Sequence, residues 1–244
     1  MILPVEKDPM GRAILDFWQH GHAARLEVIS PMFDDDEIPV DTLFREYAEM
    51  PEVEKVALSK AGGKILDVGA GAGCHSLFLQ SKGMDVTPID ISPNSVSVMR
   101  ERGLAQAECV DFFDVTDRFD TVLMLMNGIG IVGTTDALDR FFTHLDKILA
   151  PDGQLLCDSS DISYVFQTDD GTMDFPDTGR YYGELTYKMR YRDIVGESFN
   201  WLYIDADTLR EAASRNGFVV DILKEGEHYD YLARISRAEQ GRDE

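Results

Sequence analysis

The stretch KILDVGAGAGCHSLFLQ, residues 64–80, decides the fold of this chain. It begins as an apolar segment typical of a buried strand, passes through three alternating glycines, and continues with the apolar spacing of a helix. Glycine adopts positive φ readily and has no Cβ, so the backbone of Gly69–Gly73 can come close to a bound nucleotide-like ligand. A strand–loop–helix unit of this kind indicates an open parallel α/β sheet that binds its ligand at the carboxyl ends of the strands.

The spacing of the glycines distinguishes between two kinds of ligand. A dinucleotide fingerprint requires Gly-x-Gly-x-x-Gly. Here the glycines are Gly69, Gly71 and Gly73, and Cys74 occupies the position of the third dinucleotide glycine. Asp67 precedes the loop, where a carboxylate is poorly placed beside a pyrophosphate but useful near a cationic group. The spacing therefore disfavours NAD, and an NAD-dependent oxidoreductase is kept only as a remote alternative.

Acidic residues follow the next two predicted strands. Asp90 ends a strand predicted over 83–90, about twenty residues after the glycines, where a carboxylate can accept both hydroxyls of a ribose. Asp111 ends a short strand predicted over 107–112. Each acid alone has a local explanation, since Asp90 can cap the following helix and Asp111 can begin a turn. The carboxyl ends of parallel strands share one crevice, so acids after successive strands favour a common ligand site.

Residues 64–158 resemble the motifs of class I S-adenosylmethionine-dependent methyltransferases in their order and spacing. The resemblance implies S-adenosyl-L-methionine as cofactor. It also implies an α/β fold, a Rossmann-like, doubly wound, seven-stranded sheet whose last strand is antiparallel. In that family the acid at Asp111 accepts a hydrogen bond from the adenine amino group, and the apolar neighbour at Phe112 covers the ring. The cofactor-binding residues that the resemblance implies are Asp67, Gly69, Ala70, Gly71, Gly73, Asp90, Ile91, Asp111, Phe112, Met126 and Asn127.

The chain is predicted to have two parts. Residues 1–61 are expected to form a helical lid packed across the strand ends, where water has to be excluded. Residues 62–244 are expected to form the methyltransferase domain, with an insertion over 159–204. The helices predicted for the lid cover residues 11–30, 41–50 and 53–61, around an exposed acidic turn at 33–40.

The insertion is predicted to hold an antiparallel hairpin of strands 182–192 and 197–204, and it is rich in aromatic residues. These side chains can pack the hairpin onto the body, line an acceptor pocket or form a dimer interface, and the sequence leaves the choice open. A homodimer through this hairpin is therefore one partner that the sequence allows. The tail over 236–244 is predicted to be disordered.

The charge balance bears on the partners. The formal net charge is −22, from 45 acidic against 23 basic residues. Phosphate backbones are bound mainly through Lys and Arg, so a nucleic acid is disfavoured as partner. The best basic cluster is Arg180, Lys188, Arg190 and Arg192, the last three on one face of a strand. Either a solvated face or a site for an anionic small substrate would explain this cluster.

The overall composition is that of an ordinary globular protein. A chain of 244 residues with 44% hydrophobic residues is long enough for one well-buried α/β core with additions. Its three cysteines and five histidines match no metal-ligand spacing, so no metal site is expected. No apolar run is long enough to span a membrane, and the N-terminus lacks the pattern of a secretory signal. A cytoplasmic protein with no membrane partner is therefore expected.

The reaction implied by the resemblance asks the protein mainly to position two reactants and exclude water. A base is needed only where the acceptor must lose a proton, and no single residue stands out for that role. The run from Asn127 to Gly130 lacks the Pro-Pro-aromatic sequence usual in nucleic-acid amino methyltransferases. A small-molecule methyl acceptor is therefore expected, and a non-catalytic S-adenosylmethionine-binding sensor or assembly protein of the same fold is the alternative. The catalytic candidates are Asn127, Asp158, Tyr181 and His20, with Asp161, His22 and Tyr47 also within reach of the expected site.

Overall fold

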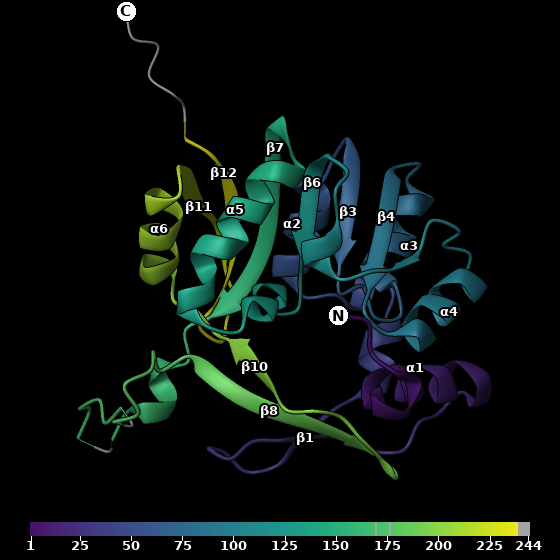
Figure 1. The fold of residues 1–244 in the computed structure, drawn as a ribbon, viewed down its shortest axis with the longest axis horizontal. Coiled ribbons are helices and arrows are strands. Elements are labelled where there is room, and N and C mark those ends of the chain that lie inside the picture. Colours follow the sequence, from purple (N-terminus) through teal and green to yellow (C-terminus); the bar gives the residue numbers. More distant parts are fainter. Residues whose placement is uncertain (169, 176, 239–244) are drawn as a thin grey trace, which may run out of the picture.

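The computed structural model describes residues 1–168, 170–175 and 177–238, which form two sheets (Figure 1). The larger sheet has seven strands in the order β11-β12-β7-β6-β3-β4-β5. All neighbouring pairs from β5 to β7 are parallel, whereas β12 is antiparallel to both β7 and β11. The antiparallel last strand predicted from the sequence is confirmed. The strands are β3 (Lys64–Val68), β4 (Asp85–Asp90), β5 (Glu108–Cys109), β6 (Phe119–Met124), β7 (Leu149–Ser160), β11 (Phe218–Glu225) and β12 (Asp230–Arg237).

Helices cover both faces of this sheet, as a doubly wound fold requires. Successive strand residues point to opposite faces, so Leu66 packs in the cluster that holds α5 and α6, while Ile65 packs in the cluster that holds α2 and α3. In Figure 1, α5 lies in front of the sheet and α2 behind it. The helices around the sheet are α2 (Glu52–Lys60), α3 (Cys74–Ser81), α4 (Pro93–Glu101), α5 (Leu138–Ile148) and α6 (Ala206–Arg215).

The second sheet is antiparallel and lies across the carboxyl ends of the parallel strands (Figure 1). Its strand order is β10-β8-β1-β2, and β9 also pairs with β8. The predicted hairpin is thus present, formed by β8 and β10, but its other edge pairs with strands from the N-terminal part of the chain. The strands are β1 (Leu26–Ile29), β2 (Asp36–Ile38), β8 (Glu184–Tyr191), β9 (Ile194–Val195) and β10 (Phe199–Leu202).

The N-terminal part is therefore less helical than predicted. The helix expected over 11–30 is α1 (Pro9–His20), which ends at Gly21; this glycine has φ 72° and its N–H donates to the carbonyl of Phe17. The acidic turn expected over 33–40 contains β2, and the helix expected over 41–50 is two short 3-10 turns, Val40–Phe44 and Tyr47–Glu49. The helix expected over 53–61 is present as an α-helix, α2. The division at residue 61 itself stays a prediction.

Two further features complete the comparison with the sequence. The tail predicted to be disordered begins too early, because Ser236 and Arg237 belong to β12 and pair with β11. Residues 239–244 of that tail lie outside the described residues. No helix in the described part of the chain is long and apolar enough to cross a membrane.

Candidate functional site

The glycine loop between β3 and α3 is held in one conformation. Gly69, Gly71 and Gly73 have φ of 67°, 56° and 83°, values that side-chain-bearing residues rarely adopt. A Cβ on Gly69 would face open space, whereas one on Gly73 would collide with Leu104 in the core. The N–H of Ala70 donates to the carbonyl of Ile89 at 3.0 Å, which fixes the loop against the end of β4. The loop therefore presents its backbone to the space beyond the strand ends.

Asp90, at the end of β4, ties this loop to the next one. Its carboxylate accepts the N–H of Gly71 at 2.9 Å through Oδ2 and the N–H of Ser92 at 2.8 Å through Oδ1. Burial raises the pKa of Asp90 to about 6. The carboxylate is thus ionised at neutral pH in a partly desolvated position, where hydrogen bonds to a ligand gain strength.

The structure brings Asp90 and Asp111 to the same small cavity of about 190 Å³. Asp111 accepts the N–H of Phe113 at 2.9 Å and also the amino group of Met1. Burial would raise the pKa of Asp111, but these hydrogen bonds outweigh it and lower the pKa. The same cavity is bordered by Ile91 and Phe112, so the carboxylates and apolar residues predicted for a nucleoside lie together.

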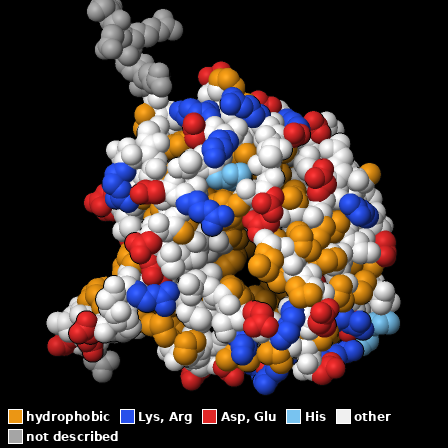
Figure 2. Space-filling view, in the orientation of Figure 1, with side chains coloured by type: hydrophobic (Ala, Val, Ile, Leu, Met, Phe, Trp, Pro, Cys, Tyr) orange, Lys and Arg blue, Asp and Glu red, His pale blue; other side chains and the backbone are white. Residues whose placement is uncertain are grey.

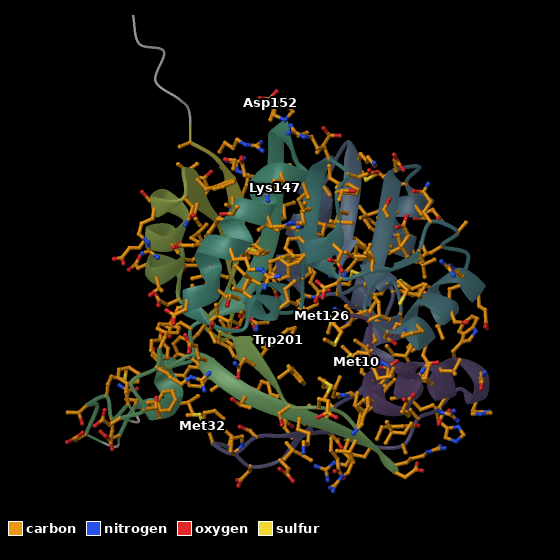
Figure 3. All side chains as sticks on the ribbon, viewed as in Figure 1. Met10, Met32, Met126, Lys147, Asp152 and Trp201 are labelled. Carbon is orange, nitrogen blue, oxygen red and sulfur yellow. The ribbon has the colours of Figure 1, made fainter. Side chains whose placement is uncertain are left out.

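A larger cavity of about 720 Å³ lies between the carboxyl end of the seven-stranded sheet and the second sheet. Figure 2 shows it as a hollow bordered largely by hydrophobic side chains. In Figure 3, Met10, Met126 and Trp201 surround this space from α1, the turn after β6 and β10. The glycine loop borders both cavities through Gly69, so the two form neighbouring parts of one site.

The turn after β6 has an unusual backbone. Met126 and Asn127 have φ of 64° and 56°, although neither is glycine. Three hydrogen bonds hold this turn: Asp158 Oδ1 accepts the N–H of Asn127 at 3.0 Å, Asn127 Oδ1 accepts from Ser159 Oγ at 3.1 Å, and Asn127 Nδ2 donates to the carbonyl of Leu202 at 3.3 Å. Residues in this conformation persist only where the surroundings over-determine them. Asn127 therefore borders the large cavity while its side chain stabilises the turn.

Asp67 and a cluster beside it lie below the glycine loop. Asp67 is buried, accepts from Ser76 Oγ at 2.6 Å, and has its pKa raised by burial. Next to it, the buried Glu54 accepts from His75 Nε2 at 2.8 Å and from Arg45 at 2.5 and 2.6 Å. Burial would raise the pKa of Glu54, but these hydrogen bonds lower it. No spacing in the sequence indicated this cluster, because Arg45 lies between two short 3-10 turns whose position depends on tertiary packing.

The other catalytic candidates take part in local contacts. Asp158 has its pKa raised to about 6 by burial and supports the turn described above. The Tyr181 hydroxyl donates to Asp205 Oδ2 at 2.6 Å and accepts the N–H of that residue at 2.9 Å. His20 is exposed at the end of α1. Of the four main candidates, Asn127 alone borders one of the two cavities described here. Among the remaining candidates, Asp161 accepts from the Tyr182 hydroxyl, Tyr47 stacks on Phe78 and His22 is exposed.

The basic cluster does not face the cavity. Arg190 pairs with Glu27 on the outer face of the second sheet, and Arg192 pairs with Asp16. Arg180 pairs with Glu184 at 3.1 Å. Three of the four residues in the cluster are thus paired with acids, and none of the four borders the cavity, which agrees with the solvated-face interpretation. Within the described residues, no group of three or more His, Cys, Asp or Glu side chains is arranged to hold a metal ion.

Comparison with known proteins matches residues 42–222 to a family described as a methyltransferase domain. A crystal structure of an S-adenosylmethionine-dependent methyltransferase from Bacteroides fragilis, in complex with S-adenosyl-L-homocysteine, is 52% identical in sequence. It superposes with a TM-score of 0.93 and covers 98% of both chains. An uncharacterized methyltransferase of Staphylococcus carnosus is 24% identical over 80% of this chain and 87% of its own. The CcbJ methyltransferase from Streptomyces caelestis, 14% identical, has a TM-score of 0.60 over 94% of this chain and 98% of its own, which shows a shared fold.

Proposed function

Since the chain belongs to the methyltransferase domain family and is a class I S-adenosylmethionine-dependent methyltransferase, we propose that it methylates a small molecule bound in the large cavity. The observation that carries this proposal is the cavity of about 720 Å³ that begins at the glycine loop and ends at the second sheet. Its size is within the range of small-molecule sites, about 300–1,000 Å³. The second sheet covers the strand ends, where an extended macromolecule would otherwise have access.

The residues of the smaller cavity fit the nucleoside part of the cofactor. Asp90 offers an ionised carboxylate for the ribose hydroxyls, and Asp111 with Phe112 offers an acceptor and an apolar surface for the adenine. The open space beside Gly69 allows a ligand to lie against the backbone there. When bound, S-adenosylmethionine supplies a methyl group already activated on a sulfonium, so no strong base is required of the protein.

The chain's own contribution is then alignment and exclusion of water. The turn at Met126 and Asn127 is rigid because three hydrogen bonds support it. The second sheet covers the cavity with apolar side chains. Good alignment of two reactants in such a site can lower the activation free energy by on the order of 7–11 kcal/mol. The net charge of −22 adds support for a small acceptor over a nucleic acid. A cytoplasmic location and a homodimer through the hairpin remain predictions from the sequence.

The test follows the methyl group. The purified protein is incubated with S-adenosylmethionine carrying an isotopically labelled methyl group and with pools of cellular small molecules, RNA, DNA and protein. We expect the label in a small molecule, with loss of labelling in Asp90→Asn and full labelling in Asp85→Asn, which changes an exposed acid at the other end of β4. Label found only in a macromolecule would refute the proposal. Cofactor binding without any labelled product would favour a binding protein without turnover.

A further inference from the structure

The face of the second sheet that lines the large cavity is apolar and aromatic with one exception. Strand pairing places Asp36, Val28 and Met189 in one row across β2, β1 and β8, and places Phe199 beside Tyr187 in the next. All five of these residues border the cavity. Asp36 is therefore the one carboxylate that the β-strands of this sheet direct to the same side as the apolar wall.

The acids on the opposite side of the same strands are already paired. Glu27 pairs with Arg190, and Glu37 pairs with Arg25 at 3.0 Å. In the described part of the chain, Asp36 forms no ion pair; its Oδ1 accepts the N–H of Glu37 at 2.8 Å. A second acid at the cavity, Asp34, likewise forms no ion pair with the described residues. Both side chains are exposed. The inward side of this sheet thus has negative charge that no ion pair within the described residues balances.

The rest of the cavity wall has the same character. Asp67 also borders the cavity, as does Glu37 from the edge strand β2, although the side chain of Glu37 is paired with Arg25. The described residues that line the cavity include no Lys and no Arg; its two histidines are His75, which is hydrogen-bonded to Glu54, and His228. Burial raises the pKa of both Tyr187 and Tyr203, and the nearby charge of Asp36 raises them further. Both hydroxyls therefore stay protonated and contribute no negative charge of their own. The aromatic residues of the wall are Phe33, Tyr164, Tyr187, Phe199, Trp201 and Tyr203.

From this arrangement we propose that the methyl acceptor carries a protonated amine on an apolar or aromatic body, and that Asp36 determines this specificity by pairing with the ammonium group. The proposal rests on the proposed function, because it places the acceptor in the cavity next to the cofactor residues. An ammonium group has a carboxylate to pair with and aromatic faces to contact, both of which attract cations. A carboxylate or phosphate at the same place meets the carboxylate of Asp36 and no Lys or Arg side chain among the described residues. The net charge of −22 also attracts cations to the protein as a whole.

A binding experiment tests this specificity without depending on turnover. Isothermal titration calorimetry measures the affinity of each probe for the protein. The probes are three compounds on one indole skeleton, tryptamine, 3-indolepropionate and the neutral 3-indolepropanol, titrated with S-adenosyl-L-homocysteine present.

We expect tryptamine to bind at least tenfold more tightly than 3-indolepropionate, with the alcohol between them. Asp36→Asn should weaken tryptamine roughly tenfold or more, the loss expected for a charge-assisted hydrogen bond, and leave the alcohol unchanged. Asp35→Asn is the matched control, because it removes a charge from the same acidic run but its residue does not border the cavity. In this control the affinity of tryptamine should change less than twofold.

Equal or tighter binding of the carboxylate, failure of tryptamine to bind, or an unchanged affinity in Asp36→Asn would overturn the proposal. Calorimetry with S-adenosyl-L-homocysteine separates this failure from failure of the proposed function. If S-adenosyl-L-homocysteine binds and an anionic small molecule becomes methylated, the proposed small-molecule methyltransferase function is supported and the proposed amine specificity is wrong. If a macromolecule is the acceptor, both are wrong.

Discussion

The turn after β6 allows a quantitative test, because one side chain supports a backbone that is itself strained. Replacing Asn127 by Ala removes the hydrogen bonds to Leu202 and Ser159, each worth about 0.5–1.5 kcal/mol. The φ of 56° adds about 1–2 kcal/mol for an alanine in the left-handed region. We therefore expect Asn127→Ala to lower the free energy of unfolding by about 2–5 kcal/mol. Asn127→Gly loses the same hydrogen bonds without the steric cost, so its loss should be smaller by about 1 kcal/mol.

The assay is urea unfolding followed by far-ultraviolet circular dichroism at pH 7.5, with all three proteins measured under identical conditions. Titration with S-adenosyl-L-homocysteine then shows whether the turn also shapes the cofactor site, and both variants should bind it more weakly than the wild type. The reasoning is refuted if the alanine variant is as stable as the wild type. It is also refuted if the glycine variant is the less stable of the two, because then the backbone at Asn127 is not strained.

Three other predictions concern Gly130 next to Trp201, the carboxylate of Asp90, and the buried pair of Glu54 and Arg45. Gly130→Ala places a methyl group against the ring of Trp201; we expect a loss of about 1–3 kcal/mol in urea unfolding from overpacking, and an unchanged stability would mean that the ring moves freely. Burial raises the pKa of Asp90 to about 6, and the ionised carboxylate is the better hydrogen-bond acceptor. The affinity for S-adenosyl-L-homocysteine, measured by calorimetry, should therefore be constant above pH 7 and fall below pH 6. An affinity of the wild type that does not change with pH, or an equal fall in Asp90→Asn, would contradict this prediction. Glu54→Ala leaves Arg45 buried without its partner, so unfolding experiments should show a loss of about 3–5 kcal/mol, and a loss below 1 kcal/mol would show that water replaces the carboxylate.

The parallel sheet was predictable because its signals are local. The glycine loop, the strand before it and the helix after it are continuous in the sequence, and Asp90 directly follows the next strand. Gly69 and Asp90 accordingly lie where the sequence places them, at adjacent carboxyl ends of strands. Signals of this kind depend on backbone conformation at single residues and on the alternation of apolar positions.

The second sheet was predictable only in part, because its pairing joins distant segments. β8 and β10 were expected as a hairpin, but β1 pairs with β8 through contacts such as Leu26 with Tyr191, which nothing in either segment announces. The acidic run around Asp36 has the composition of an exposed turn, and its role as an edge strand depends on β1 beside it. Strand preference of this kind comes from packing with neighbours more than from the residues themselves.

The side chains at the site were likewise predictable in part from the local sequence and in part only from tertiary packing. Asn127 follows β6 and Asp158 lies near the end of β7, close to the carboxyl edge where the sequence placed them. Their side chains stabilise a turn, and this role depends on hydrogen-bond partners in β7 and β10. The aromatic residues of the insertion left three uses open, and the register between β8 and β10 is what directs Trp201 to the cavity. The direction in which each side chain points could therefore be learned only from the tertiary structure, whereas residue type and position near a strand end could be predicted from the sequence.

The interaction of Asp90 with the cofactor is the point on which the account depends most directly. Isothermal titration calorimetry with S-adenosyl-L-homocysteine, at pH 7.5, compares the wild type with Asp90→Ala and with the control Asp85→Ala, after circular dichroism has shown all three to be folded. We predict that Asp90→Ala weakens binding at least tenfold, since charge-assisted hydrogen bonds of about 1.5–3 kcal/mol are lost, and that Asp85→Ala binds as the wild type does. An Asp90→Ala protein that binds with wild-type affinity would contradict the account.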